Sequence, residues 1–204
     1  MVSILKISEE DFESAVDVAH ALLHSDGVLV YPTDTVYGIG GNAISQEVVM
    51  RVHHIKEIKT QRPMSVMMAD FDMIEYYCET GLWEDTILKK YLPGPYTFIL
   101  KVRRKIAATN SERVGVRIPN SAFCQRLCQE FERPIVSTSA NITTNPPPTQ
   151  FEKIDKRILN SVDLAIDGGQ TKQGSPSVVI DLVERKLLRE GAKSGADIIE
   201  LPPP

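Results

Sequence analysis

Short clusters of hydroxyl side chains, arginines and glycines follow several apolar runs of this 204-residue chain. In the longest cluster, YPTDTVYGIGGNA at residues 31–43, a tyrosine-proline pair leads into two threonines, an aspartate and three glycines. Shorter clusters read VRIP, VSTSAN and REG, and GSPS opens a further apolar run. Hydroxyl groups, guanidinium groups and the backbone amides of glycine all bind anions. Together the clusters predict a binding site for a ligand with phosphate or carboxylate groups.

The apolar runs before these clusters have the length of buried strands, and open α/β sheets bind ligands beyond the carboxyl ends of their strands. We therefore expect the clusters to meet at one cleft, where glycines let the backbone approach the ligand closely. A simpler alternative is that Thr33 and Thr35 only form hydrogen bonds within a turn or cap. The chain has no GxxxxGK[ST] sequence and GIGGNA is not a GxGxxG fingerprint, so neither nucleotide-binding loop is expected.

The composition is that of an ordinary globular domain. Hydrophobic residues make up 42% of the chain, and no apolar stretch approaches the ~20 residues of a membrane helix. The N-terminus lacks the apolar centre of a signal peptide, and three cysteines without a clustered framework favour a reducing cytoplasm. With a net charge of −4, a nucleic-acid partner would need a local basic patch, for which Lys101, Arg103, Arg104 and Lys105 are candidates.

No metal site is expected from the histidines and cysteines. His20 and His24 are four residues apart, His53 and His54 are adjacent, and Cys124 and Cys128 are four apart. Metal ligation needs further partners at suitable spacing, which the sequence does not offer. We therefore expect surface or half-buried histidines and core thiols.

The periodicity of apolar residues predicts alternating helices and strands. Helices are expected behind Ser8 and behind Ser45, and at residues 70–79, 82–91, 122–131 and 150–161. Strands are expected at residues 28–31, 64–69, 96–102 and 114–119, within RPIVSTSAN and DLAIDGG, and in a hairpin around Glu184 and Arg185. We expect a single α/β domain over residues 1–200, with helices flanking a twisted, open, mixed sheet, and a frayed tail at 201–204.

Taken in order, YPTDTVYGIGGNA, LPGPYTFIL, VGVRIPN, PIVSTSAN and GSPSVVID followed by LLREG resemble the YrdC-like family from about Gly27 to Gly191. These are threonylcarbamoyl-AMP synthases of tRNA t6A modification, with a twisted α/β (DHBP synthase-like) fold. Longer archaeal and yeast members carry a further C-terminal domain, so the chain is expected to be the single-domain form.

The resemblance implies a reaction in which L-threonine, bicarbonate and ATP give threonylcarbamoyl-adenylate and pyrophosphate. It also implies Mg²⁺ bound with the ATP, and a downstream t6A transferase complex that moves the group to adenosine 37 of tRNA. Positioning and charge neutralisation can supply most of such a barrier. This fits a sequence without a convincing catalytic triad.

The resemblance assigns roles to single residues. Lys56 and Arg117 are the implied catalytic groups. The implied threonine ligands are Thr33, Ser65, Arg117 and Ser177, and the implied nucleotide ligands are Lys56, Thr60, Arg113, Ser137, Ser139, Asn141 and Arg189. No carboxylate cluster is available for a metal, so nucleotide oxygens and waters are expected to hold the Mg²⁺.

The chain departs from the family at one motif. Where a K-x-R sequence is expected, it reads Lys56-Glu57-Ile58, and Lys59 or Arg62 would have to reach into the gap. The departure keeps two alternatives open. One is a YciO-like paralogue that binds or hydrolyses threonylcarbamoyl-AMP, and the other is a module that binds double-stranded or transfer RNA.

Overall fold

The computed structural model describes residues 2–8, 10–60, 62–109 and 111–200, so the expected tail at 201–204 lies outside the described residues. The helices are α1 (Phe12–His24), α2 (Gln46–Ile55), α3 (Phe71–Tyr77), α4 (Leu82–Tyr91), α5 (Ala122–Phe131), α6 (Lys156–Leu159) and α7 (Ala196–Ile199), with a 3-10 turn η1 (Phe151–Lys153). The strands are β1 (Ser3–Lys6), β2 (Leu29–Tyr31), β3 (Gly38–Gly40), β4 (Val66–Met67), β5 (Cys78–Glu79), β6 (Tyr96–Val102), β7 (Arg113–Arg117), β8 (Ile135–Val136), β9 (Thr138–Ser139), β10 (Leu164–Asp167), β11 (Val178–Asp181) and β12 (Lys186–Arg189).

The strands form two mixed sheets that meet near the middle of the molecule. One sheet has the order β1-β10-β2-β3-β9, and the other has the order β12-β11-β6-β7-β4-β8 with β5 paired to β6. A bridge between Asn42 and Ile135 and a hydrogen bond of 2.8 Å from Val136 N to Gly41 O connect them. The predicted mixed α/β fold is confirmed, with its strands divided between two connected sheets.

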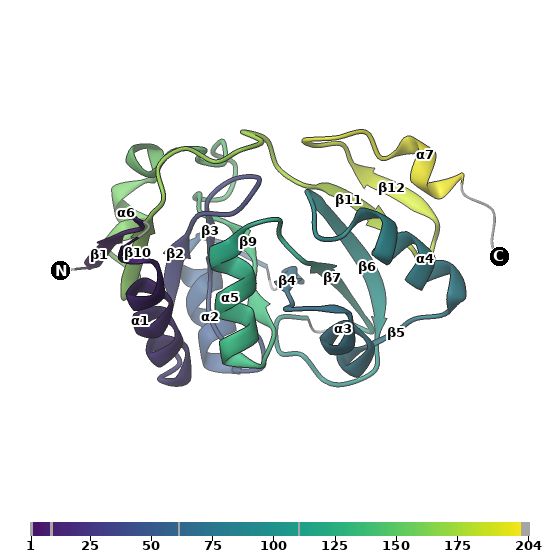
Figure 1. Ribbon diagram of the computed structural model, residues 1–204, viewed down its shortest axis with the longest axis horizontal. Coiled ribbons are helices and arrows are strands. Elements are labelled where there is room, and N and C mark those ends of the chain that lie inside the picture. The colour runs from purple at the N-terminus through teal and green to yellow at the C-terminus, as the bar shows by residue number, and fades with distance from the viewer. Residues whose placement is uncertain (1, 9, 61, 110, 201–204) are drawn as a thin grey trace.

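The first sheet is covered on both faces because its strands alternate between two cores. Leu29 and Tyr31 of β2 pack with the apolar faces of α1 and α5, whereas Val28 and Val30 pack with α2. Figure 1 shows α1, α2 and α5 beside this sheet, α3 and α4 beside the second sheet, and the two termini at opposite ends of the long axis. Among the described residues no helix is long and apolar enough to cross a membrane.

Strand directions in the second sheet bring several predicted polar clusters to one edge. β6 runs antiparallel to β7 and parallel to β11, and β12 runs antiparallel to β11. The starts of β6 and β11 therefore lie beside the ends of β7 and β12. Along this edge Val179 pairs with Thr97 on one side and with Arg189 on the other. The clusters converge as expected, although some of them precede their strands instead of following them.

Several element boundaries differ from the predictions for local reasons. The helix expected at 150–161 divides into η1 and α6, because the Asp155 side chain accepts a hydrogen bond from Arg157 N and starts a new helix. The helix expected at 70–79 ends at Tyr77, and Cys78 pairs with Val102 as β5. The loop expected at 103–113 ends one residue early, since Arg113 pairs with Lys101 in β7. The hairpin around Glu184 and Arg185 is confirmed.

The glycines after Tyr37 serve strand packing more than ligand approach. Gly40 belongs to β3, and a Cβ atom at this position would lie 1.8 Å from the backbone oxygen of Val136. A Cβ atom at Gly41 would lie 2.6 Å from the backbone oxygen of Gly27. Of the three glycines only Gly38 lines the cavity described below. The expectation that these glycines admit a ligand is therefore wrong for Gly40 and Gly41, where the missing side chain admits the backbone of a neighbouring segment.

We expect Gly40→Ala to lower the free energy of unfolding by more than Gly38→Ala, its matched control in the same strand. The added methyl at position 40 meets backbone, which cannot rotate away, whereas at position 38 it meets the side chain of Tyr31 at 2.9 Å. Overpacking of this kind costs ~1–3 kcal/mol or more. Urea unfolding of both variants checks the ranking, and equal losses would contradict the close contact between β3 and β8.

Candidate functional site

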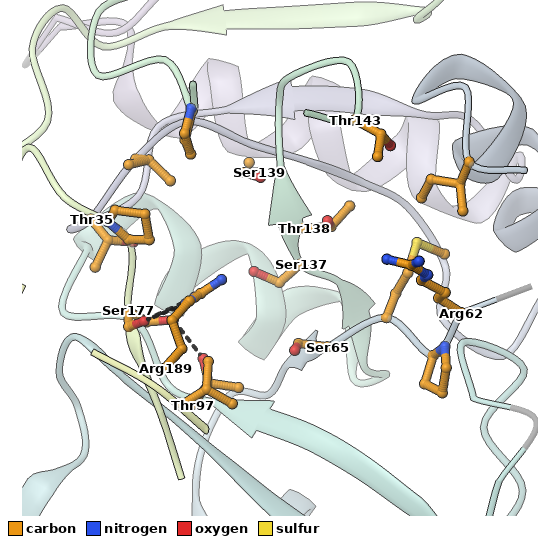
Figure 2. A pocket seen from close by; sticks show the side chains of 18 of the residues that line it. Thr35, Arg62, Ser65, Thr97, Ser137, Thr138, Ser139, Thr143, Ser177 and Arg189 are labelled. Atoms are coloured by element: carbon orange, nitrogen blue, oxygen red, sulfur yellow. Dashed lines mark hydrogen bonds between the residues drawn. The ribbon is translucent and has the colours of Figure 1, made fainter. Parts of the chain in front are cut away.

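A cavity of about 710 Å³ opens along the edge where the polar clusters meet. Its walls come from the segment after β2, the loop between α2 and β4, the β8–β9 region with the loop that follows, and the ends of β6, β7, β11 and β12. Figure 2 shows its hydroxyl side chains pointing inward from several of these segments. The predicted site residues in the lining are Thr33, Thr60, Ser65, Arg117, Ser137, Ser139, Ser177 and Arg189.

Arg117 is held at the cavity wall by a buried ion pair. Its Nη2 donates to Asp34 Oδ1 at 2.6 Å, and its Nη1 donates to Thr35 Oγ1 at 3.2 Å. The Arg117 and Asp34 side chains are only 7% and 2% exposed. Arg117 Nε and Asp34 Oδ2 are buried without a partner among the described residues. The pair is therefore only partly satisfied, and the guanidinium keeps donor capacity for a ligand.

The threonines after β2 form a turn and line the cavity as well. Thr33 Oγ1 donates to the backbone oxygen of Val36 at 2.7 Å and accepts from Thr35 N at 3.1 Å. Thr33 Oγ1 and Thr35 Oγ1 are 3.0 Å apart. The turn suggested by the simpler alternative therefore exists, and it presents both threonines to the cavity instead of excluding them from it.

A second arginine shares this end of the cavity. Arg189 donates to the backbone oxygen of Ser177 from Nε and Nη2 at 3.2 and 2.9 Å, and Nη2 lies 3.2 Å from Ser177 Oγ. Ser177 Oγ in turn lies 2.8 Å from Thr97 Oγ1 (Figure 2). Burial and the nearby positive charge of Arg117 lower the pKa of the Arg189 guanidinium. Two close guanidinium groups among hydroxyls suit a bound anion.

A glycine leaves room for the floor of the cavity. Gly115 lies in β7, and a Cβ atom there would come within 2.6 Å of Ser65 Oγ and 3.1 Å of Thr97 Cγ2. Ser65 and Thr97 can both line the cavity because this position carries no side chain. Gly115 is therefore required for the site, although the sequence shows it only as part of the motif VGVRIPN.

The opposite end of the cavity is formed by two loops. The loop after α2 contributes Ile58, Lys59, Thr60 and Arg62, and the loop after β9 contributes Thr143, Thr144 and Pro147. Figure 2 shows Arg62 across the cavity from Arg189. Ile58 lies in the wall itself, so the departure from the K-x-R motif places an apolar side chain at the site.

Lys56 links these two loops from outside the cavity lining. Its Nζ donates to the backbone oxygens of Ser139 and, at 2.8 Å, of Asn141. In return Thr143 donates to the backbone oxygen of Lys56 from its backbone N at 3.0 Å and from Oγ1 at 2.8 Å. Burial lowers the pKa of the Lys56 ammonium from 10.5 to about 8. Here Lys56 fixes the wall that carries Ser139 and Thr143.

Two further predicted residues also lie outside the lining. Arg113 pairs with Asp181 at 3.1 Å and Glu184 at 2.6 Å, next to the β11–β12 hairpin. Asn141 Nδ2 donates to the backbone oxygens of Ile142 and Asn145 at 3.0 and 2.7 Å, and its Oδ1 is buried without a partner among the described residues. Both side chains serve local structure in this conformation.

Sequence reasoning missed several residues of the lining. Thr97 and Thr138 lie within LPGPYTFIL and PIVSTSAN but are not among the predicted site residues, and the importance of Asp34 depends on a partner 83 positions away. A signal existed for Thr97, which opens a strand in LPGPYTFIL as Ser177 does in GSPSVVID. Tyr37 and Pro147 also line the cavity and carry no such signal.

The other sequence candidates lie apart from the cavity. The described residues contain no group of three or more His, Cys, Asp or Glu that could hold a metal. Cys78, Cys124 and Cys128 are buried free thiols, and burial raises the pKa of Cys78 and Cys124 to about 12. In the basic cluster, the Arg104 guanidinium lies 4.1 Å from the ring centre of Tyr76, beyond the far end of β6 from the cavity.

We expect Arg117→Met to lower the free energy of unfolding by ~3–5 kcal/mol, because it leaves the Asp34 carboxylate buried without its counter-charge. The double variant Arg117→Met with Asp34→Leu removes both charges and should recover most of the loss. Chemical unfolding of the wild type, the two single variants and the double variant gives the four free energies of unfolding of this double-mutant cycle. A double variant no more stable than Arg117→Met alone would contradict the pairing.

Lys56 predicts a pH dependence of stability. Because its pKa is about 8 in the folded protein and 10.5 otherwise, the unfolded chain binds the extra proton between these values, and folding becomes more favourable as the pH rises. Relative to Lys56→Met, the wild type should therefore gain free energy of unfolding between pH 8 and pH 10. Urea unfolding of both proteins at each pH measures the difference between their free energies of unfolding. A difference that stays constant between pH 8 and pH 10 would mean that the Lys56 ammonium is well hydrated and would contradict its lowered pKa.

Comparison with known families and proteins gives a consistent result. The Sua5/YciO/YrdC family, described as "Telomere recombination", matches residues 21–191. A relative from Methanocaldococcus jannaschii is 32% identical over 194 residues, which cover 94% of this chain and 92% of the relative. The "Threonylcarbamoyl-AMP synthase" of Klebsiella pneumoniae is 28% identical over 183 residues, covering 87% of this chain and 96% of the relative.

Solved structures agree with the family match. The structure of P. abyssi Sua5 complexed with L-threonine has a TM-score of 0.84 and 29% identity, covering 94% of this chain and 57% of that chain. The structure of E. coli YciO has a TM-score of 0.81 and 26% identity, covering 94% of this chain and 96% of that chain. The matched segment includes every cluster that lines the cavity, and the chain belongs to the Sua5/YciO/YrdC family.

Proposed function

We propose that this protein is an L-threonylcarbamoyladenylate synthase, a nucleotidyltransferase that makes threonylcarbamoyl-AMP and pyrophosphate from L-threonine, bicarbonate and ATP. The observation that carries the proposal is the single cavity with Arg117 and Arg189 at one end, Arg62 at the other and hydroxyl groups between them. Relatives named threonylcarbamoyl-AMP synthase and the threonine-bound Sua5 structure support the same substrates.

Threonine occupies the end of the cavity with two guanidinium groups. Arg117, oriented by Asp34, takes the α-carboxylate or the carbamate in a charge-assisted hydrogen bond. Thr33, Ser65 and Ser177 supply hydroxyls around the amino acid. Arg117 is therefore the one proposed catalytic group that lies in the cavity wall.

ATP occupies the remaining length of the cavity, with its α-phosphate next to the threonine end, so that Arg189 serves the phosphate there. Thr60, Ser137, Ser139 and Arg189 are the proposed nucleotide ligands in its lining. Lys56 and Asn141 contribute through the wall that they hold, and Arg113 would reach the nucleotide only by leaving Asp181 and Glu184. Arg62 is the guanidinium nearest in sequence to the missing motif arginine, and we assign it to the phosphates.

The chemistry follows from positioning and charge. The neutral amine of threonine forms an N–C bond with bicarbonate, which loses water, or with CO₂, which releases a proton, and the product is a carbamate. A carbamate oxygen then attacks the α-phosphorus of ATP, the bond between that phosphorus and the β-phosphate oxygen breaks, and pyrophosphate leaves. The arginines neutralise the charge of the transferring phosphate, and the buried walls exclude water from the reactive adenylate.

Magnesium enters as part of the nucleotide substrate. Glu57 is the one carboxylate in the described lining, and its Oε1 pairs with Arg157 Nη1 at 2.9 Å. This donor set fits a Mg²⁺ ion held by phosphate oxygens and water, with the protein contributing little direct ligation. When bound, the ion offsets the negative charge of the triphosphate.

A product that carries an activated threonylcarbamoyl group requires a transferase, which we propose to be the t6A complex acting on tRNA. The three free thiols are compatible with a reducing cytoplasm. RNA is the alternative partner, and the basic cluster at 101–105 is its proposed site, where Lys101 pairs with Glu79 in the sheet and the Arg103 guanidinium donates to the backbone oxygen of Glu75.

We expect purified protein to release pyrophosphate from ATP only when L-threonine and bicarbonate are both present, because the attacking group is the carbamate. Coupled detection of pyrophosphate, with omission of each substrate in turn, measures this requirement. Absence of pyrophosphate release, together with breakdown of supplied threonylcarbamoyl-AMP, would instead favour the YciO-like alternative. The observation behind that alternative is Ile58, which places an apolar side chain in the cavity wall where the motif has an arginine.

We also expect Ile58→Arg to raise kcat/KM for ATP by ~10-fold, since a charge-assisted hydrogen bond to phosphate contributes ~1.5–3 kcal/mol. Ile58→Met is the matched control, because it keeps the volume without adding charge. The same pyrophosphate assay compares the two variants. An unchanged rate for Ile58→Arg would mean that Arg62 already neutralises the phosphates.

A further inference from the structure

The proposed reaction leaves one buried hydroxyl at the threonine end of the cavity without a role. Thr97 is only 3% exposed, and its Oγ1 lies 2.8 Å from Ser177 Oγ, so the two hydroxyls share one hydrogen bond (Figure 2). Among the described residues the Thr97 hydroxyl has no further partner. Its hydrogen bond is therefore made to a residue that we assign to the bound amino acid.

The strands hold these two side chains together. Ser177 directly precedes β11, and Thr97 is the second residue of the parallel strand β6. Val178 N donates to the backbone oxygen of Pro95 at 3.0 Å, which fixes the register at this point. A Cβ atom at Gly115 of β7 would lie 3.1 Å from Thr97 Cγ2. The Thr97 methyl group therefore packs against β7, while its hydroxyl contacts Ser177.

The partners of Ser177 Oγ decide the direction of its hydrogen bonds. Arg189 Nη2 lies 3.2 Å from this oxygen, and a guanidinium group only donates. A carboxylate only accepts, so a carboxylate bound at this end of the cavity takes the hydrogen of the Ser177 hydroxyl. The Thr97 hydroxyl must then donate to the second lone pair of Ser177 Oγ.

We propose that Thr97 is a positioning residue that makes Ser177 a hydrogen-bond donor to the carboxylate of the bound amino acid; this inference rests on the proposed function. Two donors on one hydroxyl oxygen polarise its O–H group and strengthen the hydrogen bond that it gives. Because both lone pairs of Ser177 Oγ are then occupied, this oxygen cannot accept from an N–H group of the ligand. Thr97 therefore favours a carboxylate over an amide at this position.

Binding of L-threonine, measured by calorimetry without ATP, tests this role apart from turnover. Thr97→Val and Thr97→Ala both remove the hydroxyl, one with and one without a group in its place. Each should raise the Kd about fivefold, because Ser177 loses one of its donors. Thr97→Ser is the matched control, since it removes the methyl group and keeps the hydroxyl, and its Kd should stay within about twofold of the wild-type value. Melting temperatures confirm that the variants fold.

A second ligand separates hydrogen-bond direction from packing. L-threoninamide has an amide in place of the carboxylate, and the N–H groups of this amide donate. Wild type and Thr97→Ser should prefer L-threonine over L-threoninamide. This preference should fall about fivefold in Thr97→Val and Thr97→Ala, where a lone pair of Ser177 Oγ becomes free to accept. A change in packing alone would weaken the binding of both ligands alike.

The pyrophosphate assay gives a third readout, in which the KM for L-threonine should rise with the Kd while the KM for ATP stays unchanged. The proposal is overturned if Thr97→Val and Thr97→Ala bind L-threonine as tightly as wild type, or if folded Thr97→Ser is weakened as much as they are. An unchanged preference between the two ligands in every variant would also overturn it.

Failure of the proposed function has a different signature. If L-threonine binding responds to Thr97 as expected but the wild type releases no pyrophosphate, the synthase activity is rejected and the role of Thr97 stands. If pyrophosphate release requires L-threonine but all Thr97 variants behave as wild type, the activity stands and the role of Thr97 is rejected. A wild-type protein that binds no L-threonine would overturn both.

Discussion

The site depends on how a buried guanidinium is kept charged and still available to a ligand. Arg117 is almost completely covered, and an unpaired charge at such a position would cost several kcal/mol. Asp34 supplies the counter-charge through one oxygen, and Thr35 accepts a further hydrogen bond. Because the pairing is made through single contacts, it offsets the cost of burial and leaves donors of the guanidinium unused.

The two sheets and their helices supply the surroundings for this pair. Antiparallel and parallel pairings place the start of β6 and β11 beside the ends of β7 and β12, which sets Thr97, Ser177 and Arg189 around Arg117. Gly115 keeps the floor open between Ser65 and Thr97. At the other end Lys56 joins two loops through backbone carbonyls, so the cavity has one wall made by strands and another made by linked loops.

Positive charge is divided between the ends of the cavity, and hydroxyls occupy the middle. This division matches the proposed reaction, in which the threonine carbamate and the leaving diphosphate lie on opposite sides of the α-phosphorus atom of ATP. Ile58 places an apolar side chain at the end of the cavity where Arg62 supplies a guanidinium group.

The α/β class, most helices and strands, and eight residues of the cavity lining could be predicted from the sequence, because apolar periodicity and polar clusters at strand ends are local signals. What Lys56 and Arg113 do depends on the tertiary structure, because their partners Ser139 and Asp181 lie 83 and 68 positions away in the sequence. Asn141 instead donates within its own loop, to Ile142 and Asn145. The tertiary structure also places Gly40 against Val136 and Asp34 against Arg117, and both contacts join segments 83 or more residues apart.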